Sequence, residues 1–424
     1  MKKKNHKSGA QVSFPLDIPN VTVLEVRTNR RGDYIITVES TLKSTVCRIC
    51  GREITQFHSH GKWIELRHLS ILGHRVYIRL RPKRYECPYC SGKTTTQKLD
   101  WYEANSPHTK AYDQHLMLEL VSSTVEDVSH KENVGYDAVK GAIDRCVHSA
   151  VNWDEFDELS IIGIDEIALT KGRRNFVALI TTQQADGHVA ILAILPDRQK
   201  KTVRQFLETI PERLQRTMET ACTDMWEGYV NAVKEFAAVH SHISIKITVD
   251  RYHVAKNYRE CVDKVRKREC RRLKKQLSAP EYDALKGVMW IIRKNNRDLT
   301  ADERQTLRLV FEHSPELKLA YTFREELTAI FESSLTKDDA RIRLTKWAHK
   351  VRRSMLTCFD SFLTTLDNWL DEIVNYFVHR LNSGFVEGLN NKVKTIKRRC
   401  YGILKVTTLF QRLYLDLEGY RLFA

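Results

Sequence analysis

The spacing of hydrophobic residues divides the chain into a strand-rich beginning and a helical stretch after it. Short runs rich in β-branched and aromatic residues predict strands over residues 21–26, 34–38, 63–69 and 74–80. Between residues 112 and 151 the apolar positions recur at helical spacing instead. We therefore expect an all-β module over residues 1–105, followed by a helical domain over residues 106–152.

Two short helices in the second domain are joined by a glycine-containing turn. Thr124 can cap a helix over residues 125–133, and another helix begins near Asp137 after the turn at 134–136. Apolar positions 139, 143 and 147 share one face of that helix, which leaves Lys140 and Arg145 outside it. This pattern predicts a helix-turn-helix whose second helix contacts DNA through Lys140 and Arg145. Many helical hairpins share the pattern, so a purely structural pair of helices is the alternative.

A second strand-rich region begins at residue 160. Its first strand turns at 171–174 and returns to residue 182, and a third strand follows over 189–195. Helices at 203–214 and 226–237 separate two further strands, which end at residues 223 and 249. Three antiparallel strands followed by two strands joined through helices predict a mixed sheet of the ribonuclease H kind.

Acidic residues stand where these strands end. Asp165 closes an apolar run, and Asp224 and Asp250 each follow a strand. A buried ionised carboxylate costs several kcal/mol unless it is paired or binds a metal, so Asp165 needs a partner. A salt bridge is the alternative in a chain this basic. Glu166, next to Asp165, is expected on the opposite face of a regular strand.

The region from residue 254 to about 375 has only helical patterning and a dense basic run, which contains Lys264, Arg268 and Arg271. Because so many cations cannot all pair with acids of the same chain, we expect Lys264, Arg268 and Arg271 to contact DNA. A long solvated helix is the alternative. A last helix is predicted over residues 382–399. It carries Glu387 near its start and Lys394 and Arg398 on the same stripe, and we predict that both cations contact DNA. For Glu387 taken alone, the alternative is a first-turn charge that the helix dipole favours.

Composition narrows the class of protein. The 424 residues include 69 Lys and Arg against 53 Asp and Glu, and the pI near 9.3 predicts a polyanionic partner. There is no run of about 18 apolar residues, and the basic start lacks the apolar core of a signal peptide. We expect a soluble, cytoplasmic protein without a membrane partner.

Four of the ten cysteines form two C-x-x-C pairs, Cys47 with Cys50 and Cys87 with Cys90. Two such pairs can complete a tetrahedral four-sulfur zinc site, which is structural because no coordination position stays open. Buried free thiols or a redox pair are the alternatives.

Asp165, Asp224 and Glu387 can converge to hold two Mg²⁺ ions about 4 Å apart, with Mn²⁺ as a substitute. Such a site would catalyse in-line phosphoryl transfer on DNA. Spacing alone does not choose between Asp224 and Asp250 as the second ligand.

The sequence resembles a known family at several motifs. The runs GIDEIAL, CTDMWEGY, VDRYHVAKN and NSGFVEGLNNKVKTIKRRCYG, together with the Cys pairs and the helix-turn-helix, are similar to the DDE transposases of bacterial insertion sequences, specifically the ISL3 family. The resemblance places the catalytic acids at Asp165, Asp224 and Glu387 and gives Asp250 and His253 a supporting role.

The resemblance also implies recognition of terminal inverted repeats, DNA cleavage and strand transfer. A homodimer or higher oligomer on DNA and a place on the bacterial nucleoid are expected by analogy. The predicted core is then split into residues 153–254 and 376–424 around an all-helical insertion at 255–375. A catalytically silent DNA-binding regulator, or a nuclease that cuts without joining, remains the alternative.

Overall fold

The computed structural model describes residues 15–170, 174–380 and 384–424, without side chains at 174, 379 and 384–387. The chain divides into two compact units. Unit 1 comprises Met1–His148 with Tyr414–Ala424, and unit 2 comprises Ser149–Leu413. The C-terminal residues 414–424 thus cluster with the N-terminal unit, whereas the sequence pattern grouped them with the core.

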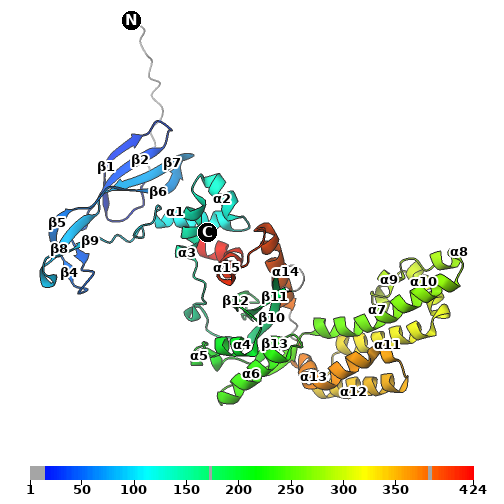
Figure 1. The fold of residues 1–424 in the computed structure, drawn as a ribbon. Coiled ribbons are helices and arrows are strands. Elements are labelled where there is room, and N and C mark those ends of the chain that lie inside the picture. Colours follow the sequence, from blue (N-terminus) through cyan, green and yellow to red (C-terminus); the bar gives the residue numbers. More distant parts are fainter. Residues whose placement is uncertain (1–14, 171–173, 381–383) are drawn as a thin grey trace, which may run out of the picture. The chain divides into compact units, whose positions relative to one another are not determined.

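Unit 1 begins with three small sheets (Figure 1). The four-stranded sheet has the order β1-β2-β7-β6, with β2 and β7 parallel, and its buried face is built on Val38, Leu66, Val76 and Ile78. A two-stranded sheet, β3-β4, and a three-stranded sheet, β5-β8-β9, hold the Cys pairs. The strands are β1 (Val21–Thr28), β2 (Tyr34–Ser40), β3 (Thr45–Val46), β4 (Glu53–Ile54), β5 (Gln56–His60), β6 (Ile64–Ile71), β7 (His74–Leu80), β8 (Lys83–Cys87) and β9 (Lys93–Thr96).

Three helices complete unit 1: α1 (Lys110–Leu120), α2 (Val125–Glu132) and α3 (Tyr136–Cys146). Thr124 caps α2 as expected, because its side chain accepts a hydrogen bond from the Asp127 N–H. The core of the three helices also contains Leu415 from α15 (Val406–Phe423), and the Ser122 N–H donates to the Asp416 carboxylate. The end of the chain is therefore part of this helical domain.

Unit 2 is built on a five-stranded sheet with the order β12-β11-β10-β13-β14. β10, β11 and β12 are antiparallel neighbours, and β13 and β14 extend the sheet in parallel with β10. The strands are β10 (Ile161–Thr170), β11 (Arg174–Gln183), β12 (Val189–Ile194), β13 (Thr220–Thr223) and β14 (Lys246–Val249).

Helices α4 (Lys200–Leu207) and α6 (Glu227–Val239) pack on this sheet through Val203, Val233 and Phe236. The single helix predicted over 203–214 is wrong. Pro211 interrupts it and becomes the N-cap of a short α5 (Glu212–Gln215), since proline cannot donate the backbone hydrogen bond that a continuous helix requires there.

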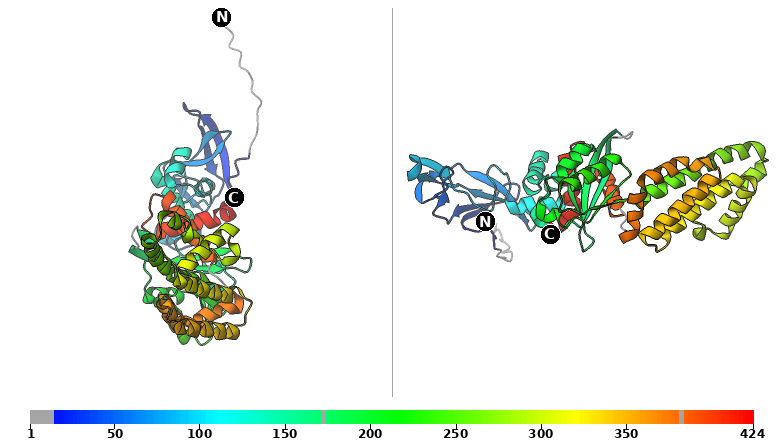
Figure 2. Two further views of the ribbon diagram at one scale, coloured as in Figure 1. Left: turned by 90° about the vertical axis from the view of Figure 1, so that its right-hand side faces the viewer. Right: turned by 90° about the horizontal axis from the view of Figure 1, so that it is seen from below.

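Between β14 and α14 (Gly384–Arg399) the chain forms an all-helical body, whose helices lie side by side in Figures 1 and 2. It is joined to the sheet by Trp369, which packs against both hydrophobic cores, and by Asn375, whose Nδ2 donates to the Ile247 carbonyl at 2.8 Å. The helices are α7 (Arg251–Gln276), α8 (Ala279–Asp283), α9 (Val288–Ile291), α10 (Ala301–His313), α11 (Pro315–Glu332), α12 (Lys337–Arg353) and α13 (Asp360–His379).

Candidate active site

Three aspartates lie at one level of the sheet of unit 2, where β13 and β14 end and β10 continues. In the parallel ladders Ile164 pairs with Thr223, and Thr223 pairs with Val249. The next residue on each strand is an aspartate: Asp165, Asp224 and Asp250. Residues in register on neighbouring parallel strands lie about 5 Å apart, so the sheet itself brings the three acids together. β10 continues to Thr170 paired only with β11, which leaves this edge open.

The carboxyl groups at this edge perturb one another. Burial raises the pKa of Asp224 to about 7, and the charges of Asp165 and Glu166 act in the same direction. The pKa of Asp165 is also raised, chiefly by burial, against the opposing effects of the Glu166 N–H, of His253 and of Asn390. These partly buried carboxylates form an oxygen-rich, electronegative site, which is the donor set that Mg²⁺ prefers.

Asp250 has a structural task besides its place in the cluster. It is the N-cap of α7, and its side chain accepts a hydrogen bond of 2.9 Å from the Tyr252 N–H. His253 lies one turn later, with its Nε2 4.0 Å from the Asp250 carboxylate. Both residues also influence the pKa of Asp165. The structure thus places Asp250 and His253 beside the two other aspartates. One carboxylate oxygen of Asp250 already accepts the hydrogen bond that caps α7.

Helix α14 contacts the acidic edge through a residue that the sequence pattern missed. The Asn390 side chain donates from Nδ2 to the Asp165 carboxylate, and Lys397 donates to the Ala168 carbonyl. Leu389, Val393 and Ile396 are buried on the same helix, as the periodicity predicts. Glu387 belongs to α14, but its side chain lies outside the described part of the structure.

Beside the aspartates, Arg198 is held by three neighbours that sequence reasoning also missed. Its Nη1 donates to the Glu166 carboxylate at 2.6 Å, and its guanidinium lies 4.7 Å from the Phe176 ring centroid and 4.3 Å from that of Trp226. Glu166 and Asp165, adjacent on β10, therefore have different partners. Arg198 stands in the loop after β12, where no local pattern distinguishes it from other surface arginines.

Gly228 explains how the Trp226 ring fits there. A Cβ at position 228 would lie 2.5 Å from Trp226 Nε1 and 3.0 Å from its Cδ1. The ring therefore packs directly on the glycine backbone, and any side chain at this position of α6 would displace it. The glycine of the run CTDMWEGY is thus required by the tryptophan two residues earlier.

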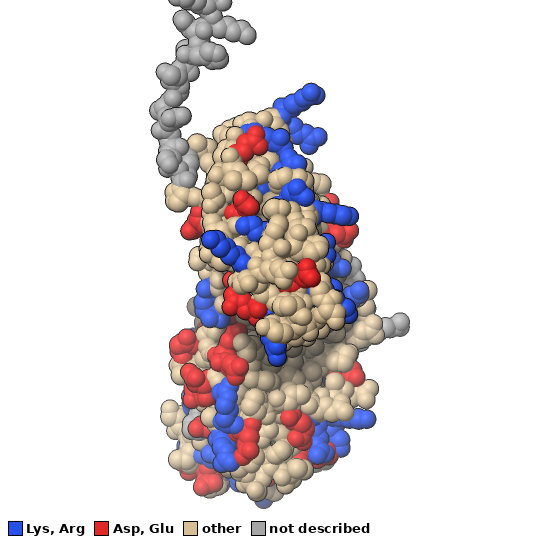
Figure 3. Space-filling model, turned by 90° about the vertical axis from the view of Figure 1, so that its left-hand side faces the viewer, with Lys and Arg blue, Asp and Glu red and all other residues tan. Residues whose placement is uncertain are grey.

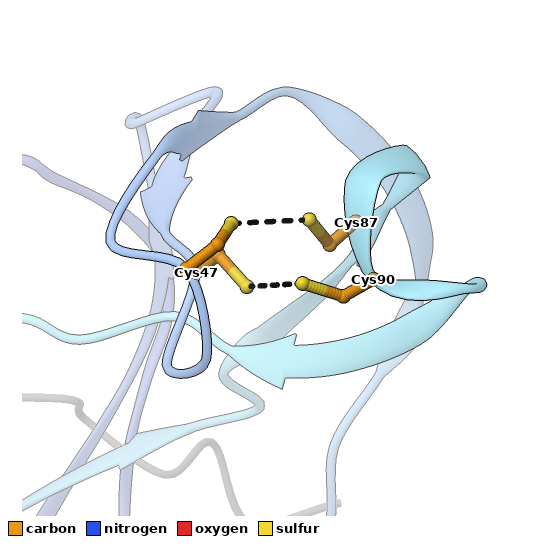
Figure 4. A group of neighbouring side chains, drawn as sticks. Cys47, Cys87 and Cys90 are labelled. Atoms are coloured by element: carbon orange, nitrogen blue, oxygen red, sulfur yellow. Dashed lines mark hydrogen bonds between the residues drawn. The ribbon is translucent and has the colours of Figure 1, made fainter.

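The four cysteines of unit 1 converge as predicted (Figure 4). Cys47 and Cys90 Sγ are 4.0 Å apart, and Cys50 and Cys87 Sγ are 3.7 Å apart. Four thiolates at about 2.3 Å from one zinc ion have S···S separations near 3.8 Å, so the cluster fits zinc. Backbone N–H groups of Cys50 and Ile49 point at Cys47 and lower its pKa to about 6, which favours the thiolate that a metal needs.

In the helix-turn-helix, the two predicted DNA contacts differ in their surroundings. Lys140 is exposed on α3. Arg145 instead forms a two-pronged ion pair with Asp113 of α1, at 2.7 and 2.9 Å, and its side chain is only 25% exposed. Asp113 also accepts a hydrogen bond from His108 at 2.8 Å. Arg145 therefore holds α3 against α1, and a contact with DNA would have to share or break this pair.

The dense basic run of α7 is partly neutralised within the helical body. Arg266 and Lys267 pair with Asp263, Arg272 pairs with Glu269, and Arg268 pairs with Glu316. Lys264 and Arg271 are exposed, and in the described part of the chain neither has an acidic partner. On α14, Lys394 and Arg398 are also exposed. Of the three α7 residues predicted to contact DNA, Arg268 alone is engaged in an ion pair.

The Lys and Arg side chains do not form a single patch on the face drawn in Figure 3. On the face drawn in Figure 3, Lys and Arg side chains are interspersed with Asp and Glu. Net charge therefore indicates an anionic partner, but this face does not locate the surface that binds it.

No helix among the described residues is long and apolar enough to cross a membrane.

Comparisons with known proteins match three successive parts of this architecture. Residues 43–90 match the zinc finger of the transposases IS204/IS1001/IS1096/IS1165, residues 97–147 match the helix-turn-helix domain of transposase family ISL3, and residues 162–413 match the transposase domain of that family. The transposase for insertion sequence element IS1001 from Bordetella parapertussis is 27% identical over 370 residues, which cover 87% of each chain. The transposase for IS1557 from Mycobacterium tuberculosis is 21% identical over 395 residues, 88% of this chain and 86% of the relative. With matches to all three domains, this zinc-binding, helix-turn-helix protein belongs to the ISL3 family of transposases.

Proposed function

We propose that the protein binds the terminal inverted repeats of an insertion sequence and catalyses DNA cleavage and strand transfer by a two-metal DDE mechanism. Asp165, Asp224 and Glu387 would hold two Mg²⁺ ions on a ribonuclease H-like sheet. The observation that carries the proposal is the register of β10, β13 and β14, which aligns Asp165 and Asp224 at one edge. A protein that only bound DNA would gain nothing from clustered carboxylates facing phosphates.

The position of α14 supports Glu387 as the third acid. Residues three apart on a helix lie on the same side, and Asn390 of α14 contacts Asp165. Glu387 precedes Asn390 by one turn, so the helix face that meets Asp165 is also the face that carries Glu387. Asp224 is proposed as the second ligand because the motif of the resembling family favours it. Hydrogen bonding does not distinguish the two candidates, since Asp224 accepts from the Trp226 N–H at 3.1 Å and Asp250 from the Tyr252 N–H at 2.9 Å.

The chain's own groups would position the reacting DNA. Divalent cations held by the three acids would activate the attacking water or 3′-hydroxyl and stabilise the leaving oxygen. Asn390 fixes the orientation of the Asp165 carboxylate, and Asp250 and His253 support the site from the start of α7. Lys394 and Arg398, exposed on α14, are suitably charged to bind the phosphates on either side of the scissile bond.

End recognition is assigned to unit 1, whose helix-turn-helix exposes Lys140 on its second helix and whose zinc site rigidifies the adjoining strands. Joining two element ends requires two copies of this reading unit, so we propose that the active form on DNA is a dimer or a larger oligomer.

The test uses pre-cleaved and intact DNA carrying the element's terminal repeats, with Mg²⁺. Asp165→Ala, Asp224→Ala and Glu387→Ala should bind DNA like the wild type but neither cut nor join. Glu227→Ala, an exposed acid three residues after Asp224, is the matched control and should stay active. Activity that survives Asp224→Ala but not Asp250→Ala would move the second ligand to Asp250.

Two results would replace the proposal. Cutting without joining of pre-cleaved ends would show a nuclease with the same site. Specific binding of both ends without any cutting, with metal supplied, would show a catalytically silent regulator.

A further inference from the structure

Helix α12 presents a basic surface that neither the comparisons nor the proposed mechanism assigns. After its first turn the helix contains no acidic residue. Beyond that first turn it carries six Lys and Arg side chains: Arg341, Arg343, Lys346, Lys350, Arg352 and Arg353. So many like charges on a single helix repel one another unless neighbouring acids or a ligand neutralise them.

Neighbouring helices neutralise only one side of this set. Toward α13, Arg341 pairs with Asp371 at 2.5 Å, and Arg352 pairs with Asp367 at 2.6 Å. These two arginines are eleven residues apart, which places them on one face of the helix. Their charges are thus already balanced within the helical body.

The other side of α12 is largely unneutralised. Residues 343, 346, 350 and 353 follow each other at steps of three, four and three, so they form one stripe along the helix. Within the stripe Lys350 reaches across to Glu326 of α11 at 2.5 Å. Arg343, Lys346 and Arg353 are exposed and have no acidic partner in the described ranges of the chain.

This stripe borders a groove of about 400 Å³ between α11 and α12. Arg343, Lys346 and Lys350 line it on the α12 side. Trp347 also lines the groove. This residue is 3% exposed, and its Nε1 donates a hydrogen bond to the Phe323 carbonyl at 2.9 Å, which fixes the position of the ring. The remaining lining, from α11, is Glu326, Ala329, Ile330 and Ser333. The groove is therefore partly apolar, with a buried tryptophan on its lining and a row of cations along its α12 side.

We propose that this groove and stripe bind the sugar-phosphate backbone of duplex DNA without regard to sequence. The inference rests on the proposed function, and it adds a second DNA-binding surface outside the helix-turn-helix. Ten residues of helix, from 343 to 353, span about 15 Å. Over that length, measured along the duplex axis, one strand of B-DNA presents about four phosphates, which is enough to engage the three cations of the stripe that have no acidic partner. Flexible Lys and Arg side chains suit phosphates, and the apolar lining suits the deoxyribose edges between them.

Salt dependence of binding tests the proposal. The full-length variant Arg343→Ala with Lys346→Ala and Arg353→Ala is titrated with a random-sequence DNA duplex at several salt concentrations. Each lost phosphate contact should reduce the slope of log K against log [salt] by about 0.9. We expect a slope lower by about 2 to 3 and an affinity at low salt weaker by about 100-fold.

Controls separate the stripe from net charge. Arg341→Ala with Arg352→Ala and Lys267→Ala removes the same charge from side chains that are already paired, and its slope should stay within about 0.5 of the wild type. The variant Arg343→Lys with Lys346→Arg and Arg353→Lys changes the same three positions but keeps their charge, so it should keep the wild-type slope. That result would show that the lower slope of the alanine variant is not caused by misfolding.

Equal losses in the stripe variant and the paired-charge control would overturn the proposal in favour of net charge alone. An unchanged slope in the stripe variant would overturn it too, and would leave the groove for a ligand other than DNA, such as an acidic peptide. Strand joining is measured separately on pre-cleaved ends. If the stripe variant shows the lower slope but the wild type never joins the ends, the DNA-binding groove is retained and the proposed function is rejected.

Discussion

Asn390 on α14 donates a side-chain hydrogen bond to the carboxylate of Asp165 on β10, although the two residues are 225 positions apart in the chain. The bond fixes one oxygen of the carboxylate, and the Glu166 N–H donates to the other at 2.6 Å. Asp165 is therefore oriented from its own strand and from the last helix of unit 2.

Asn390→Ala should slow strand joining by about 10- to 100-fold, which corresponds to the loss of one hydrogen bond to a charged group. Binding of the DNA ends should not change. The measurement is the rate of joining with pre-cleaved ends under single-turnover conditions. Asn391→Ala is the control, since that neighbour is exposed. Equal rates for the two variants would show that Asn390 does not orient Asp165 during the reaction.

Gly228→Ala should destabilise the protein, although alanine is favoured over glycine in a helix by about 1 kcal/mol. The new methyl group would collide with the Trp226 ring. Combining it with Trp226→Ala removes the collision, so the double variant should be more stable than Trp226→Ala alone. The free energy of unfolding in urea measures all three variants. Additive effects of the two substitutions would rule out the contact.

Replacing Cys47 or Cys87 by serine should reduce bound zinc from one ion per chain to none. The unit should then unfold at a lower temperature, because the metal ties together strands that share only a small core around Ile54 and Tyr85. Elemental analysis of purified protein gives the zinc content. Cys146→Ser, in α3 and away from the cluster, should keep its zinc. Retention of a full equivalent by the Cys47 variant would exclude the four-sulfur site.

The stability of unit 1 should fall at acidic pH because of Asp113. Burial alone would raise the pKa of this carboxyl group, but hydrogen bonds from His108 and Arg145 outweigh burial and hold the pKa below its usual range. A depressed folded-state pKa stabilises the fold above the unfolded value near 3.9, and the contribution is lost as pH falls through the folded value. Thermal unfolding between pH 7 and pH 2 should show this loss.

Asp113→Asn should remove that acid-dependent step and cost about 3 kcal/mol at neutral pH, because Arg145 loses its buried partner. Asp137→Asn, an exposed acid on α3, is the control and should change little. If Asp113→Asn kept the full acid dependence, other carboxylates would be responsible for it.

Features encoded over short stretches were predictable from the sequence. The placement of Asp224 directly after β13 follows from an apolar run that stops at an acid, and the zinc cluster follows from two C-x-x-C turns. Both depend on spacing within a few residues, which a pattern of hydrophobic and polar positions preserves. Asp165 was also expected at a strand end, but it lies inside β10 (Ile161–Thr170).

Contacts between distant elements were not predictable in the same way. The helical pattern put Arg145 outside the apolar face of α3, but nothing near it revealed Asp113, which lies 32 residues earlier. On α14 the expected stripe placed Lys394 and Arg398 with Glu387, but nothing near Asn390 revealed its hydrogen bond to Asp165, 225 positions earlier. That contact depends on how the helix docks on β10.

The last residues of the chain have a consequence for protein synthesis. Residues 384–413 bring α14 to the aspartates of unit 2, and residues 414–424 supply Leu415 and Asp416 to the helical domain of unit 1. Neither unit can be completed before residues 384–424 have been synthesised. A product that terminated before residue 384 would lack the helix that orients Asp165 and part of the core of the helix-turn-helix domain, so one truncation would damage both the candidate active site and the candidate DNA-binding domain.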